Sequence, residues 1–149
     1  MTVKKNISIK NVKFGKNVTI IEPVNLYGCD IGDNCFIGPF VEIQKNVKIG
    51  TNCKIQSHCF ICENTEIGDN CFIGHSVVFV NDKFLNNKTL PKGGPFLKTI
   101  ISDNVLVGSN ATILPVAIGR NVTIGAGSVV TKNCKKSNVY VGNPAKILK

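Results

Sequence analysis

The sequence predicts an all-β protein, in which a parallel β-helix of about six to seven triangular coils occupies most of the chain. The first observation is a long repeat. An apolar residue opens a turn that ends on asparagine three residues later, and successive turns start 17, 18, 18, 34 and 17 residues apart. The starts are Phe14, Ile31, Ile49, Ile67, Ile101 and Ile118, and the asparagines are Asn17, Asn34, Asn52, Asn70, Asn104 and Asn121. One unit of about 18 residues therefore repeats, and one insertion interrupts it.

The second observation is a shorter period of six inside each unit. Apolar residues stand at every sixth position from Ile31 to Phe79, and small or medium side chains form a parallel series from Cys29 to Val77. Side chains two residues apart in a strand point to the same face, so both series are expected to fill one narrow interior. A hexapeptide repeat of this kind predicts three short strands per coil, each stacked on the next coil.

Glycine and asparagine mark the expected corners. Glycine follows many apolar starts, as at Gly32, Gly50 and Gly68, and both residue types tolerate the left-handed backbone that a tight corner needs. We expect coils over residues 7–134 and a short C-terminal tail over 135–149, all within a single domain of residues 1–149. A doubly wound α/β domain would need helical stretches between its strands, and the sequence shows none.

The main interruption follows Phe79 and predicts a protruding loop over residues 80–99. Its sequence is polar, basic and punctuated by glycine and proline. Because a regular prism needs no departure from its repeat, we expect function at such an interruption.

Composition restricts the partners. The net charge of +9 comes from 18 basic residues, of which only Arg120 is arginine. Small phosphorylated ligands fit this charge better than nucleic acid, which needs aromatic platforms or a groove-reading helix. No run is apolar enough to cross a bilayer and no secretory leader is visible, so we expect a cytoplasmic protein without a membrane partner.

The cysteines and histidines do not predict a metal site. Five of the seven cysteines stand in the inward series, where cysteine acts as a small hydrophobic residue. Cys59 and Cys62 have no second pair to complete a metal shell. A zinc enzyme of the carbonic anhydrase type would need three histidines, whereas the chain has two.

His58 and His75 are the first candidates for proton transfer, because only histidine titrates near neutral pH without perturbation. They are 17 residues apart, so we expect them at one corner of adjacent coils, roughly 6 Å from each other. Asn81 falls one hexapeptide after His75, on another edge roughly 16 Å away. The two regions could meet if three chains form a closed ring, with the loop of one chain reaching its neighbour. We therefore predict a homotrimer with sites between subunits.

Three segments resemble the bacterial nucleotide-amino-sugar N-acetyltransferases, which belong to the hexapeptide-repeat acyltransferases. These segments are Ile55–His58, Cys71–His75 and Phe79–Asp82. The resemblance implies a left-handed winding, acetyl-coenzyme A (acetyl-CoA) as co-substrate and a nucleotide-linked amino sugar as acceptor. It implies catalytic roles for His75, Asn81 and Asp82, and substrate contacts from Gln56, His58, Lys83 and Phe84. Phe84-Leu85-Asn86 replaces the Pro-Arg pair of many such enzymes, so the identity of the sugar stays open.

Two downstream segments, Gly108–Pro115 and Gly125–Lys132, resemble the coenzyme-binding face of the same family, and Val141–Lys146 resembles its terminal signature. Small residues there let a pantetheine arm reach backbone groups, and lysines meet phosphates as point charges. The cofactor contacts implied by this resemblance are Gly108, Ser109, Ala111, Gly125, Ala126, Thr131, Lys132 and Lys146. It implies no metal.

The expected reaction is direct transfer of an acetyl group to an amine, in the synthesis of surface polysaccharide. One alternative is an O-acetyltransferase acting on a sugar or serine hydroxyl. Another is a scaffold without catalytic activity.

Overall fold

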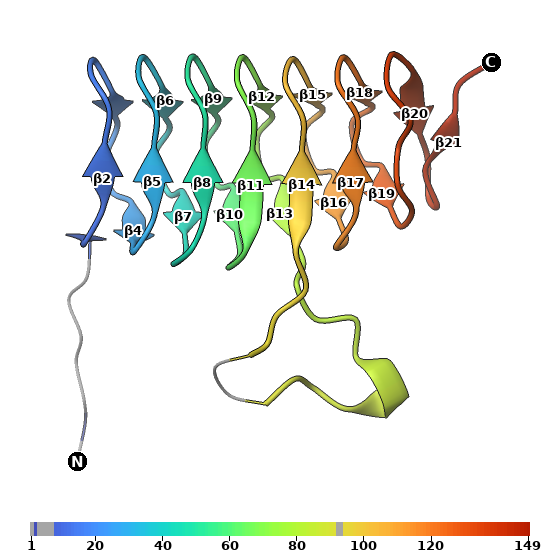
Figure 1. The fold of residues 1–149 in the computed structure, drawn as a ribbon, viewed down its shortest axis with the longest axis horizontal. Coiled ribbons are helices and arrows are strands. Elements are labelled where there is room, and N and C mark those ends of the chain that lie inside the picture. The colour runs from blue at the N-terminus through green and yellow to red at the C-terminus, as the bar shows by residue number, and fades with distance from the viewer. Residues whose placement is uncertain (1, 3–7, 92–93) are drawn as a thin grey trace.

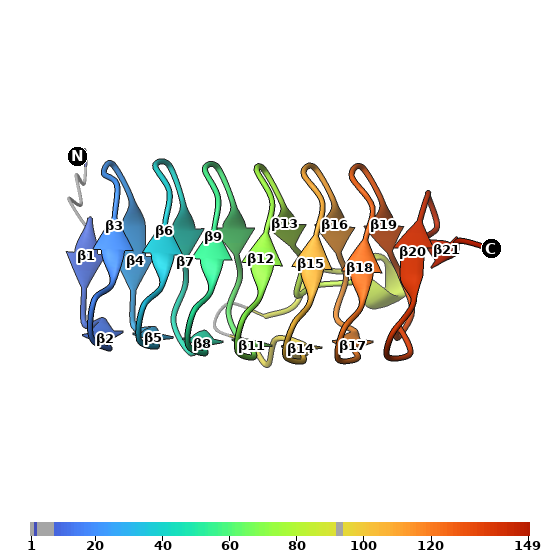
Figure 2. The same cartoon turned by 90° about the horizontal axis from the view of Figure 1, so that it is seen from above.

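The computed structural model describes residues 2, 8–91 and 94–149. Ile7, at the expected start of the coils, and Lys92 and Gly93 of the expected loop lie outside the described residues. The described chain forms a three-sided prism of about seven coils, and each side is a sheet of parallel strands (Figures 1 and 2). The predicted β-helix is confirmed.

Each sheet takes one strand from each of six complete coils. Sheet A contains β1 (Ile9–Lys10), β4 (Asn25–Tyr27), β7 (Glu42–Ile43), β10 (Phe60–Ile61), β13 (Val78–Phe79), β16 (Thr112–Ile113) and β19 (Val129–Val130). Sheet B contains β2 (Lys13–Phe14), β5 (Asp30–Ile31), β8 (Lys48–Ile49), β11 (Thr65–Ile67), β14 (Thr99–Ile101) and β17 (Ala117–Ile118). Sheet C contains β3 (Thr19–Ile20), β6 (Phe36–Ile37), β9 (Lys54–Ile55), β12 (Phe72–Ile73), β15 (Leu106–Val107), β18 (Thr123–Ile124), β20 (Val139–Val141) and β21 (Lys146–Ile147). The six complete coils run from β2 to β19, while β1 precedes them in sheet A and β20 and β21 follow them in sheet C.

The winding is left-handed, as the family resemblance implied. In Figure 1 the chain rises along the front strands of sheet B, crosses the top and descends behind. It advances to the right during each circuit, from the N-terminal to the C-terminal end.

The interior is filled by the two series that the six-residue period predicted. Ile37, Ile55 and Ile73 pair in register across sheet C and are fully buried. Cys35, Cys53 and Cys71 form a parallel inner series, buried and free of disulfides. Since every coil repeats the same inward positions, the core is a set of straight columns along the axis.

Asparagines hold the corners between sheets B and C. Asn34, Asn52 and Asn70 have φ values of 56–57°, in the left-handed region. Asn17 also donates from Nδ2 to Asn34 Oδ1 in the next coil, at 3.2 Å. The predicted role of asparagine at corners is confirmed.

The predicted loop projects from the prism between β13 and β14 as an arm (Figure 1). The arm comprises residues 80–98, because Thr99 already belongs to β14; it contains the short 3-10 helix η1 (Leu85–Asn87). β14 pairs with β11 in register, from Thr65 with Thr99 to Ile67 with Ile101. The arm therefore interrupts the sequence repeat without shifting the coils.

The expected C-terminal tail is more regular than predicted. β20 continues sheet C beside β18, and β21 returns antiparallel to β20, pairing Val141 with Lys146. The coils therefore extend beyond residue 134. Within the described residues, no helix has the length and hydropathy needed to cross a membrane.

Candidate functional site

The edge where sheet C turns into sheet A gathers most of the predicted site residues, and we call it the CA edge. Its turns form the upper row in Figure 2, where β12 leads to β13 and β15 to β16. In successive coils two residues occupy the corner: Pro39-Phe40, Ser57-His58, His75-Ser76, Ser109-Asn110 and Ala126-Gly127. The second residue of each pair has a positive φ.

His75 is exposed on this edge and contacts serines of both neighbouring coils. Its ring Nδ1 lies 2.9 Å from Ser57 Oγ in the preceding coil. Its backbone N–H donates to Ser109 Oγ in the following coil, at 3.2 Å. If Nδ1–H donates to Ser57, then Nε2 is unprotonated and can accept a proton. The arrangement can therefore hold the imidazole as a base or as an acceptor-orienting group.

Ser57 is the residue that sequence reasoning missed. It stands 18 residues before His75, one full coil, whereas His58 stands 17 before. The signal was present in the repeat, because the 18-residue step places Ser57 directly beside His75.

His58 lies on the CA edge in the coil before His75, as its spacing predicted, but it occupies the other corner position. Its φ is 63°, and its ring stacks on Phe40 with centroids 4.8 Å apart and planes 25° apart. Gln56, just before this corner, is half-buried, and its backbone N–H donates to Ile73 O at 2.9 Å. Both residues therefore lie near His75, with His58 directed toward the N-terminal coils.

Four predicted coenzyme residues, Gly108, Ser109, Gly125 and Ala126, follow His75 along the CA edge toward the C-terminus. Close stacking explains one of the glycines. A Cβ at Gly108 would meet the backbone nitrogen of Ala126, and would lie 2.8 Å from its Cα. Packing between coils thus accounts for Gly108, while half-buried Ser109 and Gly125 and exposed Ala126 give this part of the edge a surface of small residues.

Ala111 does not belong to this surface. It is fully buried, its N–H donates to Gly108 O at 3.4 Å, and its carbonyl accepts from Val78 N at 3.0 Å. Its side chain and backbone are thus used by the core and the sheet, which leaves no group to offer a coenzyme. The hexapeptide period explains the mismatch, because Ala111 falls on an inward position.

The lysines predicted to meet coenzyme phosphates lie on different edges. The tail runs along the last CA corner, since Gly142 N donates to Ser128 Oγ at 3.1 Å and Ala145 N to Val129 O at 2.8 Å. Exposed Lys146 follows directly. Thr131 and Lys132 come after β19, at the opposite end of sheet A, so one chain does not bring the two lysines together.

The arm residues also start from that opposite edge, where sheet A turns into sheet B. Asp82 organises the arm, because its Oδ1 accepts from Phe84 N at 2.9 Å and its Oδ2 from Leu90 N at 2.7 Å. Asn81 O accepts from Leu97 N at 3.2 Å, which closes the base of the arm. Lys83 and Phe84 are exposed, with Phe84 at 62%. One side of the prism, roughly 16 Å, separates these residues from His75.

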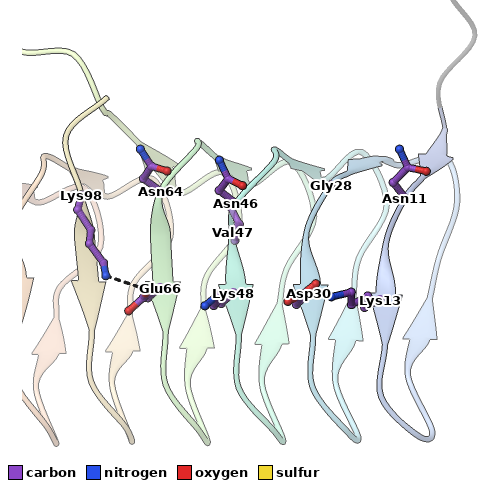
Figure 3. A pocket seen from close by; sticks show the side chains of 10 residues that line it. All are labelled: Asn11, Lys13, Gly28, Asp30, Asn46, Val47, Lys48, Asn64, Glu66 and Lys98. Carbon is purple, nitrogen blue, oxygen red and sulfur yellow. Dashed lines mark ion pairs between the residues drawn. The ribbon is translucent and has the colours of Figure 1, made fainter. Parts of the chain in front are cut away.

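Three surface hollows formed by the described residues lie away from His75 and from the arm residues Asn81 to Phe84. A groove of about 580 Å³ runs along sheet B, where Lys13, Asp30, Lys48 and Glu66 alternate in charge and Glu66 pairs with Lys98 at 2.8 Å (Figure 3). A second hollow of about 500 Å³ continues along sheet B toward Arg120. The third, of about 290 Å³, borders the CA edge at Pro23 and Phe40.

The described residues contain no group of three histidine, cysteine, aspartate or glutamate side chains that could hold a metal ion. The cysteines are interior groups. Burial raises the pKa of the Cys29, Cys59, Cys62 and Cys134 thiols to about 11. These thiols therefore stay protonated at neutral pH.

Comparison with protein families identifies the repeat. The bacterial transferase hexapeptide model (six repeats) matches residues 28–63, and the model for the hexapeptide repeat of succinyl-transferase matches residues 64–80 and 98–132. Together they match more than half of the chain. No curated protein matches the chain in sequence.

Solved structures extend this likeness. A hexapeptide-repeat acetyltransferase of Vibrio cholerae, complexed with acetyl-CoA, is 25% identical with a TM-score of 0.67, over 82% of this chain and 70% of that chain. An N-acyltransferase from Bacillus cereus, in complex with dTDP and coenzyme A, is 25% identical with a TM-score of 0.63, over 92% and 83%. A galactoside acetyltransferase in complex with coenzyme A is 31% identical with a TM-score of 0.66, over 80% and 63%.

Proposed function

We propose that this chain, which belongs to the hexapeptide-repeat acyltransferases and has acetyl-CoA as its co-substrate, acetylates the amino group of a nucleotide-linked sugar. The observation that carries the proposal is the Ser57–His75–Ser109 contact on the CA edge. It gives an exposed imidazole a defined orientation next to a stretch of small residues suited to a thioester donor. The N-acyltransferase from Bacillus cereus, bound to dTDP and coenzyme A, supports a nucleotide-linked acceptor.

The proposed site needs a second copy of the chain. His75 and the arm lie at opposite ends of sheet A, so the arm of one protomer would have to reach the CA edge of its neighbour. Exposed apolar side chains flank the CA edge on both sides: Val78 on sheet A is 38% exposed, and Phe72 and Leu106 on sheet C are 37% and 48% exposed. The arm itself carries Phe84 and Leu85, 62% and 64% exposed. These surfaces favour a ring of three protomers, with each site shared between two.

In the proposed mechanism the neutral amine attacks the thioester carbonyl carbon. His75 orients the amine and accepts its proton at Nε2, while Ser57 accepts from Nδ1–H. A backbone amide on the CA edge stabilises the oxyanion, an interaction worth roughly 3 kcal/mol in other acyl transfers. The carbon–sulfur bond then breaks, and coenzyme A leaves as the thiolate and takes up a proton. Holding both substrates in one cleft contributes much of the rate.

Coenzyme contacts are proposed for Gly108, Ser109, Gly125, Ala126 and Lys146 on the CA edge. Thr131 and Lys132 would contribute from the other edge of a neighbouring protomer. Asn81, Lys83 and Phe84 are proposed to contact the acceptor, whereas Asp82 would act mainly by holding the arm in shape.

The test measures thiol release from acetyl-CoA against a panel of uridine- and thymidine-linked 3-amino and 4-amino sugars, with the product identified by mass. We expect one amino sugar nucleotide to be acetylated on nitrogen, with at least a hundredfold preference over its hydroxyl analogue. Equal rates for the amine and the hydroxyl analogue, or no transfer to any amine, would refute the proposal.

An O-acetyltransferase is the second candidate, favoured by the similarity to a galactoside acetyltransferase. A hydroxyl is a far weaker nucleophile than a neutral amine, so this reaction would depend on His75 as a strong base. The same panel with galactosides and serine separates the two candidates.

The location and pathway are also part of the proposal. All seven cysteines are free, as is typical of a reducing compartment, which favours the cytoplasm. A role in surface polysaccharide synthesis would follow from a nucleotide-linked amino sugar as acceptor.

A further inference from the structure

The CA edge changes character at His75. The coils after His75 carry Ser109, Ala126 and Gly127, which are small, whereas the two coils before it carry aromatic rings. His58 lies one coil away and Phe40 two coils away, which is roughly 10 Å along the axis. The two coils before His75, which lie outside the proposed acetyl-CoA surface, therefore carry the stacked rings of His58 and Phe40 on this edge.

Phe40 occupies a position that suits it poorly. Its φ is 61°, in the left-handed region, and its side chain is 56% exposed. Most corner positions with positive φ in the coils hold asparagine, serine or glycine, since bulky side chains are strained there. A phenylalanine that is both strained and exposed stabilises neither the corner nor the core. Such outliers concentrate at functional sites.

A hollow of about 290 Å³ lies beside Phe40, on the side away from His58. Pro23, Val24 and Asn25 of the preceding coil line it together with Val41 and Glu42. His58 stacks on one face of Phe40, so the hollow gives a second flat group access to the aromatic ring from the N-terminal side.

The hollow also carries polar groups. Asn25 Nδ2 donates to Glu42 Oε2 at 3.2 Å. The other atom of this amide, Asn25 Oδ1, is buried and accepts no hydrogen bond from the described residues. An N–H from a ligand in the hollow would pair with this oxygen only if the Asn25 amide turns toward the hollow, and all common nucleobases carry such a donor.

We propose that Phe40, with the adjoining hollow at Pro23 and Asn25, is the nucleobase subsite of the acceptor. This inference rests on the proposed function for its choice of ligand. The base stacks on Phe40, the diphosphate follows the edge past His58, and the sugar amine arrives at His75. Roughly 10–14 Å, the rise of two to three coils, separates the subsite from His75, a span that a sugar joined to a nucleoside through two phosphates can bridge.

The decisive variant is Phe40→Asn. Asparagine suits the left-handed backbone, so the urea midpoint of this variant should equal or exceed that of the wild type. Its dissociation constant for dTDP or UDP, measured by calorimetry, should nevertheless rise about tenfold or more, the scale of base–aromatic stacking. Binding of inorganic pyrophosphate, which lacks a base, should not change. Phe14→Thr, which removes an exposed phenylalanine of sheet B, should leave nucleotide affinity as in the wild type.

Equal dTDP affinity in the wild type and Phe40→Asn would overturn the inference, as would absence of nucleotide binding to the wild type. Dissociation of the oligomer in Phe40→Asn, seen by light scattering, would also overturn it, because Phe40 would then be a subunit contact. These readouts do not depend on catalysis. If no amine is acetylated but dTDP binding is lost with Phe40, the proposed reaction falls and the subsite stands.

Discussion

Replacing Ser57 by alanine tests whether this serine acts on catalysis through His75. The hydroxyl lies 2.9 Å from His75 Nδ1 and is the one side-chain partner of that ring nitrogen among the described residues. Ser57 is half-buried and lies at a corner outside the core. We therefore expect Ser57→Ala to fold normally and to change turnover more than stability.

The size of the loss indicates the role of His75. A hydrogen bond between neutral groups contributes about 1 kcal/mol, and one to a charged group about 1.5–3 kcal/mol. If His75 only orients the acceptor, Ser57→Ala should reduce kcat about fivefold. If His75 accepts the proton, the imidazolium strengthens its bond to Ser57 in the transition state, and kcat should fall about 10- to 100-fold.

The assay is thiol release from acetyl-CoA with the acceptor found in the panel, measured for Ser57→Ala, His75→Ala and the double variant. If Ser57 acts through His75, the double variant should be no slower than His75→Ala. Ser57→Thr, which keeps the hydroxyl, should restore most of the rate, and Ser76→Gly serves as the control on the same edge. Additive losses in the double variant would refute the reasoning, since Ser57 would then act independently of His75.

Three further predictions concern the solenoid. Asn52→Ala should lower the free energy of unfolding by about 1–2 kcal/mol, because alanine is strained at its φ of 56°, whereas Asn52→Gly should be nearly neutral in the same urea titration. Gly108→Ala should weaken acetyl-CoA binding, measured by calorimetry, and lower the urea midpoint, because the added Cβ would press on Ala126. Unchanged acetyl-CoA affinity in this variant would show that Gly108 does not contribute to the proposed acetyl-CoA surface. Stability should fall as pH rises from about 9 to about 11, because the buried thiols of Cys29, Cys59, Cys62 and Cys134 ionise near pH 9 when unfolded and near pH 11 when folded. Cys59→Ala should flatten that decline, and urea midpoints independent of pH over this range would contradict the assigned burial.

The coils were predictable because their determinants are local and repeated. Each apolar residue of the six-residue series, such as Ile55 or Ile73, has one inward position, and every corner asparagine has one backbone conformation. The 18-residue step also placed His58 and His75 on one edge. These features need no knowledge of contacts between distant segments.

Other features depended on details that a period does not contain. Ser57 was missed because its neighbour His58 is the titratable residue at this corner. A one-residue offset nevertheless decides that Ser57, and not His58, contacts the His75 ring nitrogen Nδ1. Ala111 was assigned to the coenzyme from its motif, whereas its inward register buries it. β20 and β21 were missed because their pairing with β18 and with each other lies outside the asparagine repeat.

The two ends of the arm meet at one corner. Leu97 N donates to Asn81 O, Asn64 Nδ2 donates to Phe96 O at 3.1 Å, and β14 resumes the register of β11. The arm can therefore lengthen, shorten or be exchanged without displacing any coil. If the arm contacts the acceptor as proposed, acceptor preference can change with the length and sequence of the arm while the coils keep their register, and grafting arms between relatives would then transfer that preference.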